Sequence, residues 1–170
     1  MCGVRAAQAA LAAVLTVACG SGGGDTWAGL YAVSHHTLNQ GACEGEGGFM
    51  NKPAFFRLRL DEGTYRYSEC GSAAPAACGL ETIWFDHHSG GTWTGSQDGS
   101  SLSGDLCTFY HRTFTASRTA EGTLRLELRD HIGQAVTPTP CSADEAGRRS
   151  PTLACSQLEV LSGKPVEAQH

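Results

Sequence analysis

The sequence lacks the short patterns that usually reveal an enzyme or a metalloprotein. It contains no Gly-x-Ser-x-Gly turn, which presents the nucleophilic serine of many hydrolases. It contains no Cys-x-x-Cys, in which two residues lie between the cysteines, the spacing typical of structural zinc sites. Acidic pairs such as Asp61-Glu62 fall in expected turns, where water is their simplest partner. These absences favour a protein that is not an enzyme, has no catalytic residues or metal ligands, and needs no cofactor.

Helical and membrane-spanning patterns are also scarce. After residue 25, no run of ten residues places apolar side chains at the spacing of one helix face. The apolar stretch at residues 6–18 is 13 residues long, whereas a transmembrane helix needs about 20. Its length and its position after Arg5 predict the hydrophobic part of a cleavable export signal, residues 1–18.

Basic residues are too few to form a nucleic-acid-binding face. The chain has 12 Lys and Arg against 17 Asp and Glu, a net charge of −5. Nucleic acids and anionic membrane surfaces select basic protein faces. We therefore expect no nucleic-acid partner.

The signal ends in residues 16–20, Thr-Val-Ala-Cys-Gly, which resemble the lipobox of bacterial lipoproteins. Ala18 and Cys19 fit that pattern, whereas the threonine three positions before the cysteine departs from the preferred leucine. The resemblance implies cleavage after Ala18 and three acyl chains, palmitate among them, on Cys19. Two or more chains hold a protein firmly on a membrane. The membrane is thus the expected partner through an N-terminal lipid anchor.

The residue after Cys19 indicates to which membrane a lipoprotein is sorted. Gly20 is not the aspartate that retains lipoproteins in the inner membrane, so the resemblance favours the cell outer membrane. The alternative is ordinary cleavage near residue 24, which would give a secreted protein. Residues 19–25 are rich in glycine and predict a flexible tether. The remaining residues, 26–170, predict a single β-domain.

Cysteine usage points to disulfides. Cys2 lies in the signal, and Cys19 is assigned to the lipid. An even number of further cysteines in an exported chain predicts three disulfides, formed in an oxidising compartment. The cysteines concerned are Cys43, Cys70, Cys78, Cys107, Cys141 and Cys155.

Loop length suggests how these cysteines pair, although six cysteines allow about 15 connectivities. Cys70 with Cys78 would close a short loop, and Cys141 with Cys155 a loop of moderate length. Elimination then leaves a third pair, Cys43 with Cys107.

Alternation of apolar and polar residues with period two predicts about nine short strands and an all-β fold. Asp98-Gly99 is a strong hairpin signal between two of them. An antiparallel meander of this size closes into a small barrel of about 8–9 strands, stapled by disulfides, or splits into a β-sandwich. The expected strands cover residues 26–34, 54–60, 64–68, 80–85, 91–96, 101–106, 108–117, 123–129 and 156–161.

The opening Trp27-Ala28-Gly29-Leu30-Tyr31, followed by hairpins, resembles the lipocalin-type up-and-down barrel, although lipocalins begin with Gly-x-Trp. In a barrel with spare interior space, strand aromatics would line a pocket for a small apolar ligand. The candidate ligand-binding residues are Trp27, Tyr65, Trp93 and Phe109.

A filled core would favour a different function. The chain would then be an envelope structural or protein-interaction module, and its partner would be an envelope protein. Its function would lie in the two long irregular stretches, residues 39–53 and 133–155.

Histidine doublets are the remaining candidates for metal ligands. Neighbouring residues of a strand point to opposite faces, so His35-His36 and His87-His88 can each offer one ligand to a given site. A metal site needs three or four converging ligands. We therefore expect solvated histidines and no metal.

Overall fold

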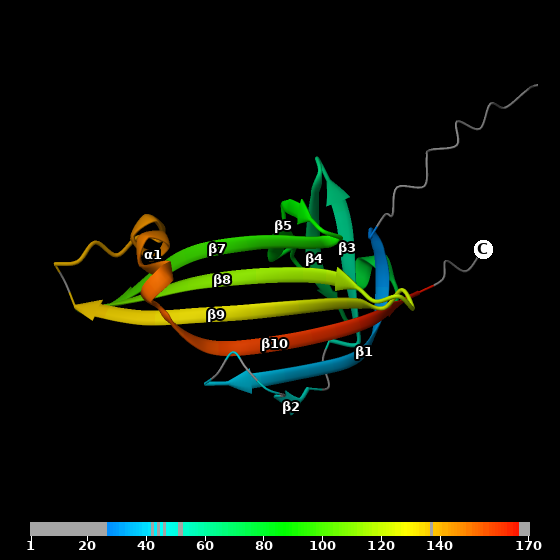
Figure 1. Ribbon diagram of the computed structural model, residues 1–170, viewed down its shortest axis with the longest axis horizontal. Coiled ribbons are helices and arrows are strands. Elements are labelled where there is room, and N and C mark those ends of the chain that lie inside the picture. The colour runs from blue at the N-terminus through cyan, green and yellow to red at the C-terminus, as the bar shows by residue number, and fades with distance from the viewer. Residues whose placement is uncertain are drawn as a thin grey trace, which may run out of the picture.

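The computed structural model describes residues 27–41, 43, 45, 47–50, 53–136 and 138–166, so the expected signal, Cys19 and the whole of the expected tether lie outside it. Figure 1 shows strands throughout and one short helix. Within the described ranges, no helix is both long and apolar enough to cross a membrane. The elements are β1 (Gly29–Gln40), β2 (Gly48–Phe49), β3 (Phe55–Asp61), β4 (Thr64–Cys70), η1 (Pro75–Ala77), β5 (Ile83–Phe85), β6 (His87–Ser89), β7 (Thr92–Ser103), β8 (Leu106–Arg118), β9 (Leu124–Val136), α1 (Ala143–Arg149), η2 (Ser150–Thr152) and β10 (Ala154–Pro165).

The strands form one antiparallel sheet. Their order is β5-β4-β3-β1-β10-β9-β8-β7-β6, with β2 attached to β1. Most neighbouring strands are close in sequence, whereas the β1–β10 pair joins the first long strand to the last. The predicted all-β antiparallel meander is confirmed, and it forms a nearly closed barrel rather than a sandwich.

The barrel closes because the two ends of the sheet are consecutive in the chain. β5 pairs with β4, β6 pairs with β7, and only Asp86 lies between β5 and β6. The backbone N–H of Asp86 donates to the carbonyl oxygen of Thr94 at 3.0 Å. Gly95 permits this approach, since a Cβ there would overlap the carbonyl oxygen of Trp84. One short segment thus covers both sheet edges, which would otherwise be left unpaired.

Aromatic and leucine side chains fill one end of the barrel. Phe56 is fully buried, and Tyr31 stacks on it with the ring centroids 5.0 Å apart. We call this cluster the closed end; both the start of β1 and the end of β10 lie beside it (Figure 1). Its buried members are Trp27, Tyr31, Phe56, Leu58, Tyr65, Tyr67, Ile83, Phe85, Phe114, Ala116, Leu124, Leu126 and Leu161.

At the opposite end, β7, β8 and β9 extend past the other strands and carry α1 (Figure 1). Ala146 of α1 packs against Phe109 in a second, smaller cluster. The helix lies in a stretch that was expected to be irregular. The N–H of Glu145 donates to the Ser142 hydroxyl oxygen at 3.2 Å, as in a Ser-x-x-Glu capping box. That pattern was the sequence signal that could have predicted α1.

The hairpin predicted at Asp98-Gly99 is wrong, because the two strands expected on either side of it are one continuous strand, β7. Gly99 pairs with Tyr110 of β8. The Tyr110 ring covers the glycine and occupies the space that a side chain there would need. The turn falls instead at Gly104-Asp105, where Gly104 has a φ of 58°.

Three disulfides staple the fold, which indicates folding in an oxidising compartment outside the cytoplasm. The predicted Cys70–Cys78 pair is confirmed, whereas the other two predicted pairs are wrong. Sheet register and the packing of α1, rather than loop length, decide which cysteines meet. The bonds are Cys43–Cys155, Cys70–Cys78 and Cys107–Cys141.

Replacing Gly95 with alanine should lower the free energy of unfolding by about 1–3 kcal/mol, the usual cost of overpacking. The reason is the overlap between the new Cβ and the Trp84 carbonyl. Urea denaturation measures the change. Gly71→Ala is the matched control, because nothing lies within 4 Å of the Cβ position there, and its effect should stay within about 0.5 kcal/mol. Equal effects from the two variants would contradict this account of closure.

Candidate functional site

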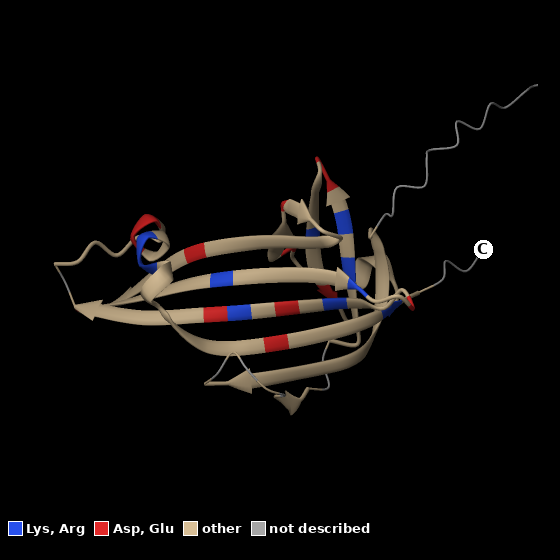
Figure 2. Cartoon of the chain, viewed as in Figure 1, with Lys and Arg blue, Asp and Glu red and all other residues tan. Residues whose placement is uncertain are grey.

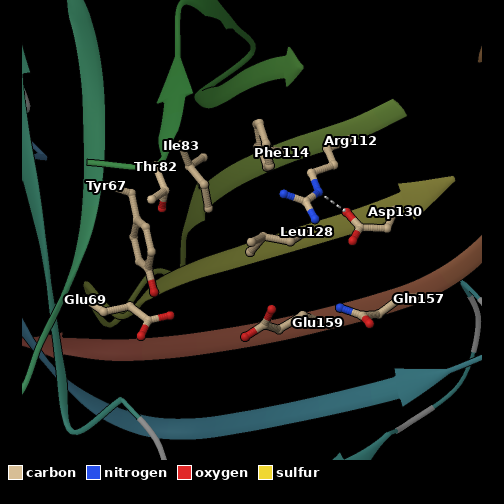
Figure 3. A pocket seen from close by; sticks show the side chains of 10 residues that line it. All are labelled: Tyr67, Glu69, Thr82, Ile83, Arg112, Phe114, Leu128, Asp130, Gln157 and Glu159. Carbon is tan, nitrogen blue, oxygen red and sulfur yellow. Dashed lines mark ion pairs between the residues drawn. The ribbon is translucent and has the colours of Figure 1, made fainter. Parts of the chain in front are cut away.

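A cavity of about 190 Å³ lies inside the barrel, beyond the aromatic cluster of the closed end. Its lining residues come from β4, β8, β9, β10 and the start of β5, and Figure 3 shows them from close by. We call it the mouth cavity. Its floor is apolar: Ile83 is 6% exposed and Phe114 is 2% exposed, and Leu128 packs beside them.

Three carboxylates surround the mouth cavity. Asp130 is paired with Arg112, whose Nε lies 3.0 Å from Oδ1 of the aspartate. Glu159 is hydrogen-bonded to Nε2 of the buried His36 at 2.6 Å. Glu69 lies at the exposed rim, and no hydrogen bond or ion pair links its carboxylate to another residue of the described ranges. Figure 2 shows the charged residues that cross the middle of β8, β9 and β10.

Tyr67 adds a phenol to the same wall. Its side chain is 4% exposed, and Figure 3 shows it reaching toward the edge of the cavity where Glu69 and Glu159 lie. Burial, with a further contribution from these two negative charges, holds the pKa of Tyr67 well above its usual value. The phenol therefore stays protonated and can donate a hydrogen bond at any physiological pH.

The charges that line the mouth cavity favour a positively charged ligand over a negatively charged one. Its lining contains the carboxylates of Glu69, Asp130 and Glu159 but one guanidinium, that of Arg112. An anion placed here would meet net repulsion and no spare cation. A cation would find the unpaired carboxylate of Glu69 at the rim.

Three of the four predicted ligand-binding residues come together, but at the closed end. The ring of Tyr65 lies 4.9 Å from that of Trp93 and 6.4 Å from that of Trp27, between centroids. The N–H of Trp27 donates to the Tyr65 hydroxyl oxygen at 3.0 Å. Phe109 lies far along β8, in the small cluster under α1. None of the four lines the mouth cavity.

A second hollow of about 460 Å³ opens on the surface of the closed end. Trp27 and Trp93 line it, with His88 stacked on Trp93 at 4.8 Å and the guanidinium of Arg118 5.5 Å from the centroid of the Trp27 ring. The side chains that line this hollow are therefore already paired with one another.

The two histidine doublets do not converge. His36 turns inward to Glu159, while His88 stacks on Trp93 at the closed end. The acidic residues of the mouth cavity were missed by sequence reasoning. The available signal was the alternation in β4, where Tyr65, Tyr67 and Glu69 share one face, so that a carboxylate follows two buried aromatics.

No known protein family matches the chain, and no curated protein or solved structure matches it either.

Tyr67 predicts an alkaline limit to stability. The unfolded phenol loses its proton near pH 10, whereas the folded phenol keeps it, because its pKa is raised. Stability is thus unaffected below pH 10 and falls above it, by about 1 kcal/mol between pH 10 and 11. Tyr67→Phe should remove this fall, as measured by urea denaturation at several pH values. Tyr110→Phe, the control, should keep it because Tyr67 is still present. An unchanged slope in Tyr67→Phe would contradict the assignment.

Proposed function

We propose that this protein is an extracytoplasmic binding protein, anchored to the envelope by lipid on Cys19, whose barrel binds a small ligand without catalysis. The ligand carries a positive charge and a short apolar part. The observation that carries this proposal is the mouth cavity, where three carboxylates and one guanidinium stand above an apolar floor.

Cavity size limits the apolar part of the ligand. An apolar cavity of about 150 Å³ admits benzene, and the mouth cavity measures about 190 Å³. A fatty acid would be too long for this space, and its carboxylate would face Glu69 and Glu159. A small amine with one ring or a few carbons fits both the volume and the charge.

Each part of such an amine has a partner in the cavity. Ile83, Phe114 and Leu128 take up its carbon atoms, which removes apolar surface from water. Glu69 has no other partner among the described residues and accepts a hydrogen bond from the ammonium group. This bond offsets the free-energy cost of removing the ammonium group from water. Tyr67 is a hydrogen-bond donor at the same edge and so favours a ligand that also carries an acceptor.

The position of the anchor suits this function. The chain enters the barrel at the closed end, at Trp27, and α1 marks the opposite end (Figure 1). Trp27 is eight positions after Cys19, and a fully extended chain over eight positions reaches up to about 28 Å. The closed end would face the bilayer, and the mouth cavity would open away from it.

Three ligands of one shape test the charge requirement: benzylamine, benzyl alcohol and benzoate. Calorimetry on the oxidised mature domain should detect binding of benzylamine, weaker binding of benzyl alcohol and no binding of benzoate. Glu69→Gln should weaken benzylamine about 10-fold, as expected for a lost charge-assisted hydrogen bond. Glu127→Gln is the matched control, because Glu127 lies on the outer face of β9, where it pairs with Arg125 and Arg129.

Other outcomes discriminate the alternatives. Equal affinity for all three compounds, with quenched tryptophan emission, would place binding in the hollow beside Trp27 and Trp93 and overturn the proposed site. No heat with any of the three would favour the interaction module, whose function lies in residues 39–53 and 133–155.

The anchor has its own test. Mass spectrometry of the protein from the membrane fraction should find an N-terminal, acylated Cys19 and no free thiols. Cys19→Ala should move the protein out of that fraction, whereas Cys2→Ala, in the expected signal, should leave it there. A native product that begins near residue 24 and carries no fatty acid would refute the anchor and leave the ligand proposal standing.

A further inference from the structure

A row of metal-ligand residue types crosses the outer face of the sheet. The register places Asp98 of β7 opposite His111 of β8, His111 opposite His131 of β9, and His131 opposite Cys155 of β10. Residues directly opposite in antiparallel strands share a face. Arg112 follows His111 and lines the mouth cavity, so the row lies on the other, outer side of the sheet.

Cys43 completes the cluster. It lies just beyond the end of β1 and forms the disulfide with Cys155. The sulfur atoms of Cys43 and Cys155 and a ring nitrogen of His131 all lie within 4.8 Å of one another, and the three residues are half-buried. A small displacement of each group would place all three atoms about 2.0–2.3 Å from a metal ion bound between them, which is the length of a metal–ligand bond.

The two histidines of the row are also close together. The ring centroids of His111 and His131 are 6.1 Å apart. Nδ1 of His111 is hydrogen-bonded to the Asp98 carboxylate at 2.7 Å, which leaves Nε2 as its remaining ligand atom. A histidine held by a carboxylate in this way is the usual arrangement of a metal-binding imidazole.

We propose that reduction of the Cys43–Cys155 disulfide opens a metal site formed by the two cysteines and His131, with His111 as the fourth ligand. A dithiol supplies two electrons and two protons, becomes a disulfide itself, and leaves two protein thiols. Binding of the metal then releases both thiol protons, because thiolates are the ligands. Two sulfurs and two imidazole nitrogens match the structural ligand set of Zn²⁺.

This disulfide differs from the other two in access as well as in neighbours. Cys70 is 1% exposed and Cys107 is 0% exposed, so one sulfur of each other bond is shielded from attack by a reductant. Both Cys43 and Cys155 are half-buried. Since exchange requires access of a thiolate to the bond, a dithiol should reduce Cys43–Cys155 first.

The first experiment maps the order of reduction in the mature, folded protein. Graded dithiothreitol followed by alkylation and peptide mass spectrometry should label Cys43 and Cys155 before any other cysteine. Circular dichroism should retain the sheet signal at that stage. Prior labelling of Cys70 or Cys107, or loss of the sheet signal when this one bond opens, would overturn the proposal.

The second experiment titrates the partly reduced protein, freed of dithiothreitol, with Co²⁺ as a coloured substitute for Zn²⁺. We expect one equivalent to bind with a thiolate-to-cobalt charge-transfer band, and Zn²⁺ to displace it. His131→Ala should weaken binding more than about 100-fold, and Asp98→Asn, which removes only the support of His111, about 10-fold. His88→Ala at the closed end is the control and should change nothing.

Two results would contradict the site. Equal cobalt binding by the oxidised protein would exclude the thiolates as ligands. Unchanged binding in His131→Ala, with the charge-transfer band still present, would exclude His131 as a ligand.

Discussion

The pairing of one short segment with two different strands is the constraint on which this structure depends. A sheet exposes unpaired N–H and C=O groups at both edges, and here β5 covers the β4 edge while β6 covers the β7 edge. The change of partner occurs at Asp86, and the absence of a side chain at Gly95 lets the two strands approach. Closure separates an inside from an outside, and each proposed site belongs to one of these two faces.

The same strands serve both sites because successive side chains point in opposite directions. On β8, Arg112 lines the mouth cavity while His111 belongs to the outer row. On β9, Asp130 points inward and His131 outward. A residue of one site therefore lies next in sequence to a residue of the other site, although the two side chains are on opposite faces of the sheet.

The class of fold could be predicted from the sequence, because alternation in β3, β4, β8 and β9 is clear and a meander of that many strands is expected to close or to split into two sheets. The finer errors have physical causes. The Tyr110 ring, which is remote in sequence, keeps Gly99 inside a strand instead of a turn. The histidines are expected to be solvated, but a β-bulge between Val33 and His35 shifts the alternation of β1, so that His36 turns inward and is buried.

The predicted ligand-binding residues come together only in part. Trp27, Tyr65 and Trp93 meet at the closed end, where Trp27 and Trp93 line a surface hollow, whereas Phe109 lies in the cluster under α1. The polar groups of the mouth cavity come from four strands and the start of a fifth, and no local pattern reveals that Glu69, Asp130 and Glu159 converge. Cysteine pairing likewise depends on the pairing of β1 with β10, which brings Cys43 to Cys155 and which loop length does not encode.

The two ends of the described chain lie side by side, since the N–H of Val166 donates to the carbonyl oxygen of Leu30 at 2.9 Å. Nothing in the ring of strands depends on where the polypeptide is interrupted, because β1 and β10 are neighbours like any other pair. The order of the strands could therefore be rotated: a short linker would join the present ends, and new ends would open at the exposed Gly104-Asp105 turn. With the proposed anchor attached to its new N-terminus at the α1 end, such a permuted chain would present the barrel in the reverse orientation.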